Sequence, residues 1–309
     1  MTKCNKINLN GVFVPIITPF ESNTENVEFN YLIENIRKLN STKVSGYMPL
    51  GSNGEFKSIS DDEALSTIKV IRENMSSDKI LLAGTGRESS KSTIEFTKKA
   101  ADLGIDAAFV LTPHYFANKM DDSALIKFYY TVADQSPVSL MIYSAPGFAS
   151  NVSISPNAVH ELSQHENIIG MKDTSNLDIS SYIKASSKAN QFSVLAGSLN
   201  KFLKALKLGA TGGVLSAANF MPDLCCKLYE LYVHGESLKA DNLSDLLIKL
   251  NKEVSGKYGV PGVKTAMNLT GYHGGMPRSP LCGLEECHIN ELKEILFNGI
   301  NEMENITNK

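Results

Sequence analysis

The chain has 309 residues, of which 42% are hydrophobic and 20% charged, and its 30 basic and 33 acidic residues leave a formal net charge of −3. This composition is typical of a globular protein and excludes a disordered, collagen-like or coiled-coil chain. Because the charges are spread evenly and no basic block stands out, we expect no nucleic-acid partner.

Hydropathy and cysteine content bear on the compartment. No apolar run approaches the roughly 18 residues of a membrane span, and the first ten residues lack the apolar core of a signal peptide. The five cysteines include an adjacent pair at 225 and 226 but no CxxC motif. We therefore expect reduced thiols in a cytoplasmic protein that has no membrane partner.

Short β-branched runs alternate with amphipathic stretches along the first two thirds of the chain. The runs predict strands at residues 12–18, 46–51, 80–84, 107–112, 138–144, 168–173, 193–197 and 213–217. The amphipathic stretches predict helices near residues 28–39, 61–74, 91–103, 123–134, 156–163, 179–189 and 201–208. The strands are apolar on both faces, which is typical of parallel strands covered by helices. Eight alternations predict an α/β fold of the (β/α)₈ TIM-barrel type, with an open doubly wound sheet as the alternative.

From residue 221 onward the strand signals stop. The remaining periodicity predicts helices at residues 224–233, 238–254, 264–269 and 289–302. We therefore expect a barrel domain at residues 8–220 that carries the catalytic site. Residues 221–309 are expected to form a small C-terminal helical extension packed on that barrel.

Lys172 is the most informative polar residue at a predicted strand end. It closes the run at 168–173, and the period-two alternation of a strand places it on one face with Gly170. If that face points into the barrel, the glycine leaves room below an amine that lies among apolar side chains. Burial disfavours the charged ammonium, and a neutral amine can attack a ketone to form a Schiff base. The alternatives are a solvent-exposed lysine or one paired with Asp173.

Two tyrosines follow neighbouring predicted strands. Tyr143 ends the strand before Lys172, and Tyr115 lies in the loop after the strand at 107–112. Imine chemistry needs a group that moves protons, and a phenol can do so. The alternative for Tyr143 is a half-buried structural tyrosine.

The second predicted strand leads into Gly51-Ser52-Asn53-Gly54-Glu55. Backbone N–H groups in such a turn can converge on an anion, so this loop is a candidate carboxylate site. A strand-to-helix turn with Glu55 as a capping residue is equally compatible with the spacing. The six histidines are scattered and form no recognised metal-binding motif, so we expect no metal and disfavour a zinc-dependent aldolase.

Five short motifs occur in order along the chain. They are Gly51-Ser52-Asn53-Gly54-Glu55, Thr112-Pro113-x-Tyr115, Tyr143-x-x-Pro146, Gly170-x-Lys172-Asp173 and Leu195-Ala196-Gly197-Ser198. Together they resemble the dihydrodipicolinate synthase / N-acetylneuraminate lyase superfamily of pyruvate-handling barrels. The resemblance implies a class I aldolase or lyase that needs no cofactor beyond a covalent lysine imine with pyruvate. It also implies a homotetramer built as a dimer of dimers.

The resemblance implies a role for each matching position. Lys172 corresponds to the imine-forming lysine and Tyr143 to the tyrosine that relays protons beside it. Tyr115 matches the phenol that the family donates across a dimer interface. Ser52 and Asn53 stand where the family binds the keto-acid carboxylate, with Ser52 also in the proton chain.

Three further positions bear on the pocket and on the substrate. Gly197 and Leu215 match positions whose backbone lines the family's pocket. Phe148 stands where dihydrodipicolinate synthases carry an arginine that binds the second substrate's carboxylate, and a phenyl ring cannot replace that guanidinium. This departure argues against lysine biosynthesis and admits a hydrophobic aldehyde partner.

Other motif strings bear on the choice within the superfamily. Residues 51–56, 163–165 and 170–173 resemble 4-hydroxy-2-oxoglutarate aldolases, which produce pyruvate and glyoxylate, although Phe148 replaces a position that is more often polar there. The alternatives are a synthase that condenses pyruvate with aspartate semialdehyde, a keto-deoxy-sugar-acid aldolase or dehydratase, and a keto-acid-binding barrel without turnover.

Overall fold

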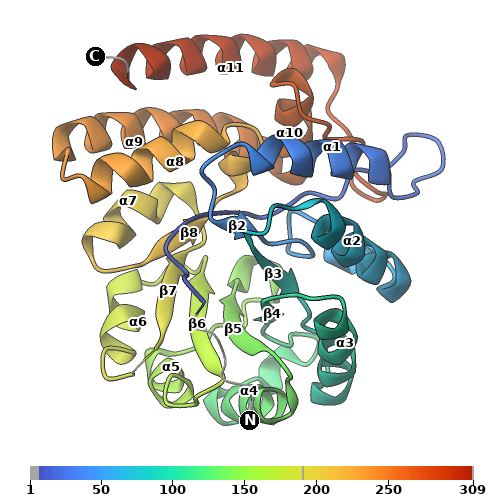
Figure 1. The fold of residues 1–309 in the computed structure, drawn as a ribbon, viewed down its shortest axis with the longest axis vertical. Coiled ribbons are helices and arrows are strands. Elements are labelled where there is room, and N and C mark those ends of the chain that lie inside the picture. The colour runs from blue at the N-terminus through green and yellow to red at the C-terminus, as the bar shows by residue number, and fades with distance from the viewer. Residues whose placement is uncertain (1–6, 190, 308–309) are drawn as a thin grey trace. The chain divides into compact units, whose positions relative to one another are not determined.

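Eight parallel strands form a closed barrel in the order in which they occur along the chain (Figure 1). The computed structural model describes residues 7–189 and 191–307. The strands are β1 (Gly11–Val14), β2 (Gly46–Tyr47), β3 (Ile80–Gly84), β4 (Ala107–Leu111), β5 (Ser139–Ser144), β6 (Ile168–Asp173), β7 (Ser193–Ala196) and β8 (Gly212–Val214). The predicted (β/α)₈ class is confirmed.

Among the residues that the structure describes, seven α-helices alternate with the strands and four follow them. The first group comprises α1 (Phe29–Asn40), α2 (Asp61–Asn74), α3 (Ser90–Asp102), α4 (Asp122–Gln135), α5 (Pro156–Leu162), α6 (Ile179–Ala185) and α7 (Leu199–Lys207). The second comprises α8 (Pro222–Val233), α9 (Ser237–Asn251), α10 (Lys257–Leu269) and α11 (Glu286–Thr307). Short 3₁₀ turns lie in loops after strands, at η1 (Phe56–Ser58), η2 (Ala117–Lys119), η3 (Pro146–Phe148) and η4 (Ser216–Asn219).

The chain forms two compact units, of which the first is built on residues 80–214. In this unit α3, α4 and α5 begin after Ser89, Asp121 and Ser155, whose side chains accept backbone N–H groups of the first turn. Their apolar faces pack on the outer side of the strands, where the Tyr129 hydroxyl of α4 donates to the Val110 carbonyl of β4 at 3.0 Å. Figure 1 shows α3 to α6 on this outer side of the strands.

The second unit is built on residues 11–79 and on the chain from residue 215 onward. Its α9 packs against α8 and α11, and Figure 1 shows α11 running beside α9. The predicted gap between helices at residues 255–263 is mostly helical, because a π-helical turn at Lys252–Gly256 joins α9 to α10. The interruption within this gap is at Gly259, whose φ of 60° and ψ of −141° are not helical, two residues before Pro261.

Three strands end three or more residues before their predicted ends, and the lost residues lie in loops. β1 stops at Val14 because Pro15 has no N–H group to donate to a neighbouring strand. β2 stops at Tyr47, and Leu50, predicted to be extended, has a left-handed φ of 62°. β8 ends at Val214 and a 3₁₀ turn follows. The hydrophobic pattern identified the buried segments but not the points at which they leave the sheet.

Among the described residues we find no helix with the length and apolar character that crossing a bilayer requires. The division of the chain into a barrel domain at 8–220 and an extension at 221–309 stays a prediction.

Candidate active site

Lys172 lies on β6 and is only 4% exposed. The opposite face of the same strand pair carries Ser144 and Asp173, and Tyr182 of α6 lies beside Ser144 on that outer side. Since neighbouring residues of a strand point to opposite faces, the amine of Lys172 lies on the face turned away from the helices. A primary amine is thus held inside the barrel, where water has little access to it.

Tyr143 lies next to Lys172 on the neighbouring strand. The two residues are partners in the register of β5 and β6, and the Lys172 Nζ atom lies 4.3 Å from the centroid of the Tyr143 ring. Phe109 of β4 packs edge-on against the same ring, with the centroids 6.0 Å apart. The structure therefore brings together the two residues for which the sequence predicts nucleophilic and proton-relay roles.

The structure gives a different reason for the glycine at position 170 from the predicted one, which was to leave room below the Lys172 amine. A Cβ atom at this position would lie 2.5 Å from the Ser193 carbonyl oxygen of β7 and 3.1 Å from the Met141 Cε atom of β5. The space beside Gly170 is therefore occupied by a neighbouring strand, and the glycine permits the close approach of β6 and β7.

The Asp173 carboxyl group is fully buried on the outer face of β6. Its Oδ1 atom accepts the Ser175 N–H group at 2.9 Å. Burial raises the pKa of Asp173, and the hydrogen bonds from Ser175 oppose this only in part. The Asp173 carboxyl thus orders the segment that follows β6 and points away from the face that carries the Lys172 amine.

Tyr115 and Phe148 lie in loops after β4 and β5, and both are exposed, at 77% and 62%. The Glu88 Oε2 atom accepts the N–H groups of His114 and Tyr115, at 2.8 and 2.9 Å, and so fixes the backbone that carries the Tyr115 ring. The structure does not bury Tyr115 as it buries Lys172 and Tyr143. Phe148 ends the 3₁₀ turn η3.

Gly197 lies against the chain that follows Lys172. Its N–H group donates to the Asp173 carbonyl at 2.7 Å, and a Cβ atom at this position would lie 2.2 Å from Thr174 Cγ2 and 2.6 Å from that carbonyl oxygen. A larger residue would displace the end of β6, so glycine is required here for backbone packing.

In the second unit, Ser52 and Asn53 are half-buried in the loop that follows β2. This loop closes on itself through hydrogen bonds from the Gly54 N–H group to the Gly51 carbonyl (3.0 Å) and from Glu55 to Ser52 (3.1 Å). The Asn53 side-chain amide donates to the Ser216 hydroxyl at 2.7 Å. The backbone hydrogen bonds of the turn and the contact with Ser216 thus fix the loop that carries the Ser52 and Asn53 side chains.

Leu215 and Ser216 lie where the chain leaves β8. Leu215 is buried, its N–H group donates to the Phe13 carbonyl at 3.1 Å, and its carbonyl accepts the Ala218 N–H group at 3.0 Å. No sequence motif links Ser216 to Asn53, because only the fold brings the two residues together.

The Glu55 side chain does not cap the following turn, so that alternative is wrong. Its Oε1 atom instead lies 2.6 Å from the Lys264 Nζ atom of α10, and the two side chains are 2% and 1% exposed. Desolvation lowers the pKa of Lys264 to about 8, although Glu55 acts in the opposite direction. No motif pointed to Lys264, since no local spacing links it to Glu55.

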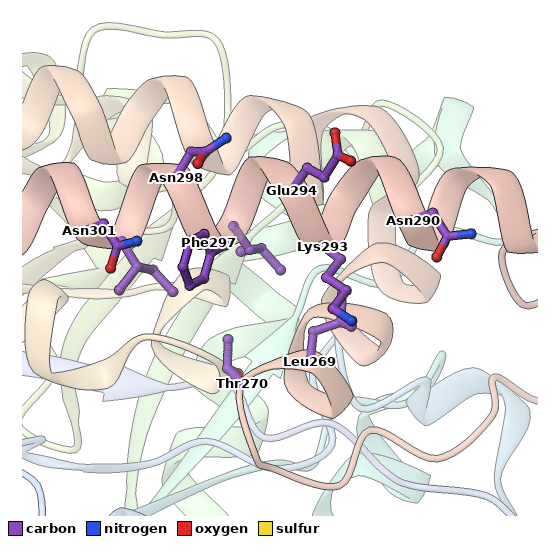
Figure 2. A pocket seen from close by; sticks show the side chains of 10 residues that line it. Leu269, Thr270, Asn290, Lys293, Glu294, Phe297, Asn298 and Asn301 are labelled. Carbon is purple, nitrogen blue, oxygen red and sulfur yellow. The ribbon is translucent and has the colours of Figure 1, made fainter.

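Two other features contain none of the predicted site residues. Glu285, Cys287 and His288 place possible metal-ligand atoms within 4.8 Å of one another at the start of α11, and the first two are exposed. The prediction of a metal-free site stays a prediction. A groove of about 710 Å³ lies beside α11, between Phe297 and the end of α10 at Leu269 and Thr270 (Figure 2).

Comparison with known proteins identifies the family. The model of the dihydrodipicolinate synthetase family matches residues 8–298. The chain belongs to this family. The dihydrodipicolinate synthetase resemblance and the expectation of a carbon–carbon lyase are thereby confirmed.

Relatives in this family have different names. The chain is 28% identical to an L-threo-3-deoxy-hexylosonate aldolase from Hypocrea jecorina, covering 92% of this chain and 94% of that protein. It is 31% identical to a 4-hydroxy-tetrahydrodipicolinate synthase from Methanothrix thermoacetophila, covering 93% and 95%. Among solved structures it is similar to YagE of E. coli, a family member in complex with pyruvate, with a TM-score of 0.88, 25% identity and 95% and 99% coverage.

Proposed function

We propose that this protein is a class I aldolase that cleaves or forms a hydroxy 2-oxo acid through a Schiff base between Lys172 and pyruvate. One observation carries the proposal: a lysine amine is buried inside the barrel against the ring of Tyr143, 4.3 Å from its centroid. A primary amine that is kept from bulk water beside a phenol is suited to nucleophilic attack on a carbonyl carbon. No external cofactor takes part in the proposed reaction.

The proposed cleavage begins when the Lys172 amine adds to the C2 carbonyl of the 2-oxo acid, and loss of water yields a protonated imine. Tyr143 moves the proton from the C4 hydroxyl, so that the C3–C4 bond breaks and its electron pair passes to the imine. The aldehyde leaves and an enamine remains. Protonation of C3 and hydrolysis then release pyruvate and regenerate the amine.

Ser52 and Asn53 are proposed to bind the carboxylate of the 2-oxo acid. Their loop is held by its own backbone hydrogen bonds and by the contact from Asn53 to Ser216, so its donors are ordered before substrate arrives. Preorganised donors of this kind lower the cost of orienting a substrate. Gly197 and Leu215 are proposed to line the pocket with their backbone.

Tyr115 is proposed to act from a second copy of the chain. Its ring is 77% exposed, while Glu88 holds its backbone in place. An exposed aromatic ring on a fixed loop is suited to a contact between subunits. With this role we propose a homotetramer built as a dimer of dimers, in the cytoplasm, whose ligands are small 2-oxo acids and aldehydes.

For the aldehyde partner we propose glyoxylate, so that the cleaved substrate is 4-hydroxy-2-oxoglutarate. The loop residues Ser52 and Asn53 support this choice. The first alternative is a 3-deoxy sugar acid, which is supported by the name of the Hypocrea jecorina aldolase. Condensation with aspartate semialdehyde is supported by the name of the Methanothrix synthase, but Phe148 lacks the guanidinium that would bind that substrate's carboxylate.

Borohydride reduction tests the nucleophile. Wild type treated with pyruvate and borohydride should gain the mass of one reduced pyruvate adduct per chain. Lys172→Ala should gain none while keeping its fold, and the control Lys184→Ala, which removes an exposed lysine of α6, should react like wild type. Absence of an adduct with every 2-oxo acid tried would refute the Schiff-base mechanism.

Substrate cleavage tests the choice of aldehyde. Pyruvate release from 4-hydroxy-2-oxoglutarate should exceed release from 3-deoxy sugar acids, and condensation with aspartate semialdehyde should be slower than either. An adduct with pyruvate but no turnover of any of these compounds would favour a keto-acid-binding protein and contradict the aldolase assignment.

A further inference from the structure

A buried ion pair lies directly behind the loop that carries Ser52 and Asn53. Glu55 ends this loop, and its Oε1 atom is 2.6 Å from the Nζ atom of Lys264 on α10. Removing two charges from water is costly, and a buried ion pair is by itself weak evidence for stability. The pair therefore calls for an explanation other than stabilisation of the fold.

Both members of the pair have additional partners. The Lys264 ammonium donates to the Met276 carbonyl at 2.7 Å and lies 4.5 Å from the centroid of the Phe20 ring. The second carboxylate oxygen of Glu55 accepts the backbone N–H group of Arg278 at 3.0 Å. Because both of its oxygens are engaged, the Glu55 carboxylate is held at two points.

The segment that supplies the Arg278 N–H group is itself anchored. The Arg278 guanidinium donates to the Ser58 carbonyl at 2.7 Å and to the Glu63 Oε1 atom at 2.7 Å, and it lies 4.2 Å from the Phe20 ring centroid. Ser58 follows the loop, and Glu63 lies in the first turn of α2. Arg278 thus ties the C-terminal side of the loop to the Glu55–Lys264 pair.

The loop needs such support because its backbone is strained at both ends. Leu50 and Glu55 have φ values of 62° and 52°, in a left-handed region that non-glycine residues rarely adopt. Such residues persist only where the surroundings hold them. At the first end the Leu50 side chain is buried, and at the second end the Glu55 carboxylate is held by Lys264 and Arg278.

We infer that Glu55 and Lys264 are positioning residues that hold the Ser52–Asn53 loop in the conformation that binds the carboxylate of the 2-oxo acid. This inference rests on the proposed function. Neither residue is assigned a contact with substrate or with the reacting atoms. Their effect is on the affinity for the 2-oxo acid, which the loop binds, rather than on the chemistry at the Lys172 amine.

The inference predicts a pH dependence of 2-oxo-acid binding. Burial lowers the pKa of Lys264 to about 8, and Arg278 adds to this lowering while Glu55 opposes it. The other charged groups nearby are Glu63, which binds Arg278, and Glu25, whose carboxylate accepts a hydrogen bond from the Ser279 hydroxyl. When Lys264 loses its proton above about pH 8, the attraction to Glu55 is lost and the loop is released.

The decisive variant is Lys264→Met, which keeps an unbranched side chain one atom shorter than lysine and removes its charge. The readout is the rate of borohydride trapping as a function of pyruvate concentration. We expect the half-saturating concentration to rise about tenfold or more, while the rate at saturation stays within about threefold of wild type. In wild type the half-saturating concentration should rise above pH 8, and this rise should be absent in Lys264→Met and in Glu55→Gln.

Two controls separate positioning from general destabilisation. Lys257→Met makes the same change on the same helix at an exposed ion pair with Glu291, and it should leave the half-saturating concentration and its pH dependence unchanged. Leu247→Ala removes a fully buried side chain of α9. It should lower stability without changing the half-saturating concentration of the folded protein.

The outcomes distinguish this inference from the proposed function. If wild type forms no adduct with pyruvate, both are refuted. If wild type forms the adduct and folded Lys264→Met keeps its half-saturating concentration within twofold, only the inference is overturned. If Lys264→Met does not fold, Glu55→Gln and the wild-type pH profile decide, and a half-saturating concentration constant from pH 7 to 9 overturns it.

Discussion

Replacing Gly170 with alanine tests whether the close approach of β6 and β7 positions the Lys172 amine. Gly170 is paired with Ser193 in the register of the two strands, and a Cβ atom would lie 2.5 Å from the Ser193 carbonyl oxygen. The other near atom, Met141 Cε at 3.1 Å, ends a flexible side chain and can move away. The carbonyl cannot, so one of the two strands must shift.

The size of the effect follows from this geometry. Inserting a methyl group into a filled interior costs roughly 1–3 kcal/mol, and a displaced backbone places Gly170→Ala toward the upper end of that range. Alanine also restricts the unfolded chain, which offsets roughly 0.4–1 kcal/mol. We therefore expect a net loss of about 2 kcal/mol in the free energy of unfolding. Since a misplacement of about 1 Å can cost about 10² in rate, imine formation should slow by roughly 10–100-fold.

Urea unfolding and the borohydride trapping rate at saturating pyruvate measure the two effects. The control is Gly147→Ala, because a Cβ atom at Gly147 meets nothing within 4 Å, and its stability should stay within about 0.5 kcal/mol of wild type. A double-mutant cycle with Met141→Ala identifies the limiting contact. If removing the Met141 side chain restores the stability of Gly170→Ala, the backbone argument is refuted.

Three further predictions concern single side chains. Tyr143→Phe keeps the ring against Lys172 but loses the hydroxyl, so pyruvate release should slow about 10²–10⁴-fold while imine trapping persists; an unchanged cleavage rate would remove Tyr143 from the mechanism. Arg278 lowers the pKa of Glu63 from 4.5 to about 2, so this ion pair stabilises the fold above about pH 4.5 and the stabilisation is lost as the pH falls toward 2. Glu63→Gln should therefore lower the free energy of unfolding by about 1–2 kcal/mol at pH 7 and by almost nothing near pH 2. The loss at pH 7 is smaller than the pKa alone implies because the Glu63 side chain is 30% exposed. Equal losses at both pH values in denaturant titrations would contradict this prediction. Phe148→Arg should raise kcat/KM for aspartate semialdehyde by about tenfold, by adding a charged partner for its carboxylate; no gain in a condensation assay would show that residue 148 does not contact that substrate.

The barrel could be predicted because each part of its pattern is local. A parallel strand covered by helices on one side and by the barrel interior on the other is apolar on both faces, and a short sequence window records this. The ends of the strands were less predictable. In β1 the apolar pattern continues past Val14, but the strand ends there because Pro15 has no backbone N–H group to donate. In β2 the pattern continues past Tyr47, but the strand ends there and Leu50 adopts a left-handed φ.

The pairing of Lys172 with Tyr143 could also be predicted, because the strands that carry them are consecutive. Parallel strands of a barrel place their carboxyl ends at the same edge, so two strand-end residues become neighbours without further information. The role of Gly170 was not predictable in the same way. Its space is taken by Ser193 and Met141, which lie on the two neighbouring strands, and no pattern within β6 records how closely those strands approach.

Contacts between distant parts of the chain account for what the sequence analysis missed in the second unit. Arg278 donates to Glu55 across 223 residues of sequence, and Lys264 reaches the same carboxylate from α10. From residue 221 onward the periodicity predicts a helical extension, whereas the catalytic site is expected within residues 8–220. The cations of this extension instead hold a carboxylate that ends the Ser52–Asn53 loop. A buried charge paired with a strained loop residue is thus a stronger indication of a functional role than either feature alone, because the fold gains little stability from the ion pair and the loop depends on it.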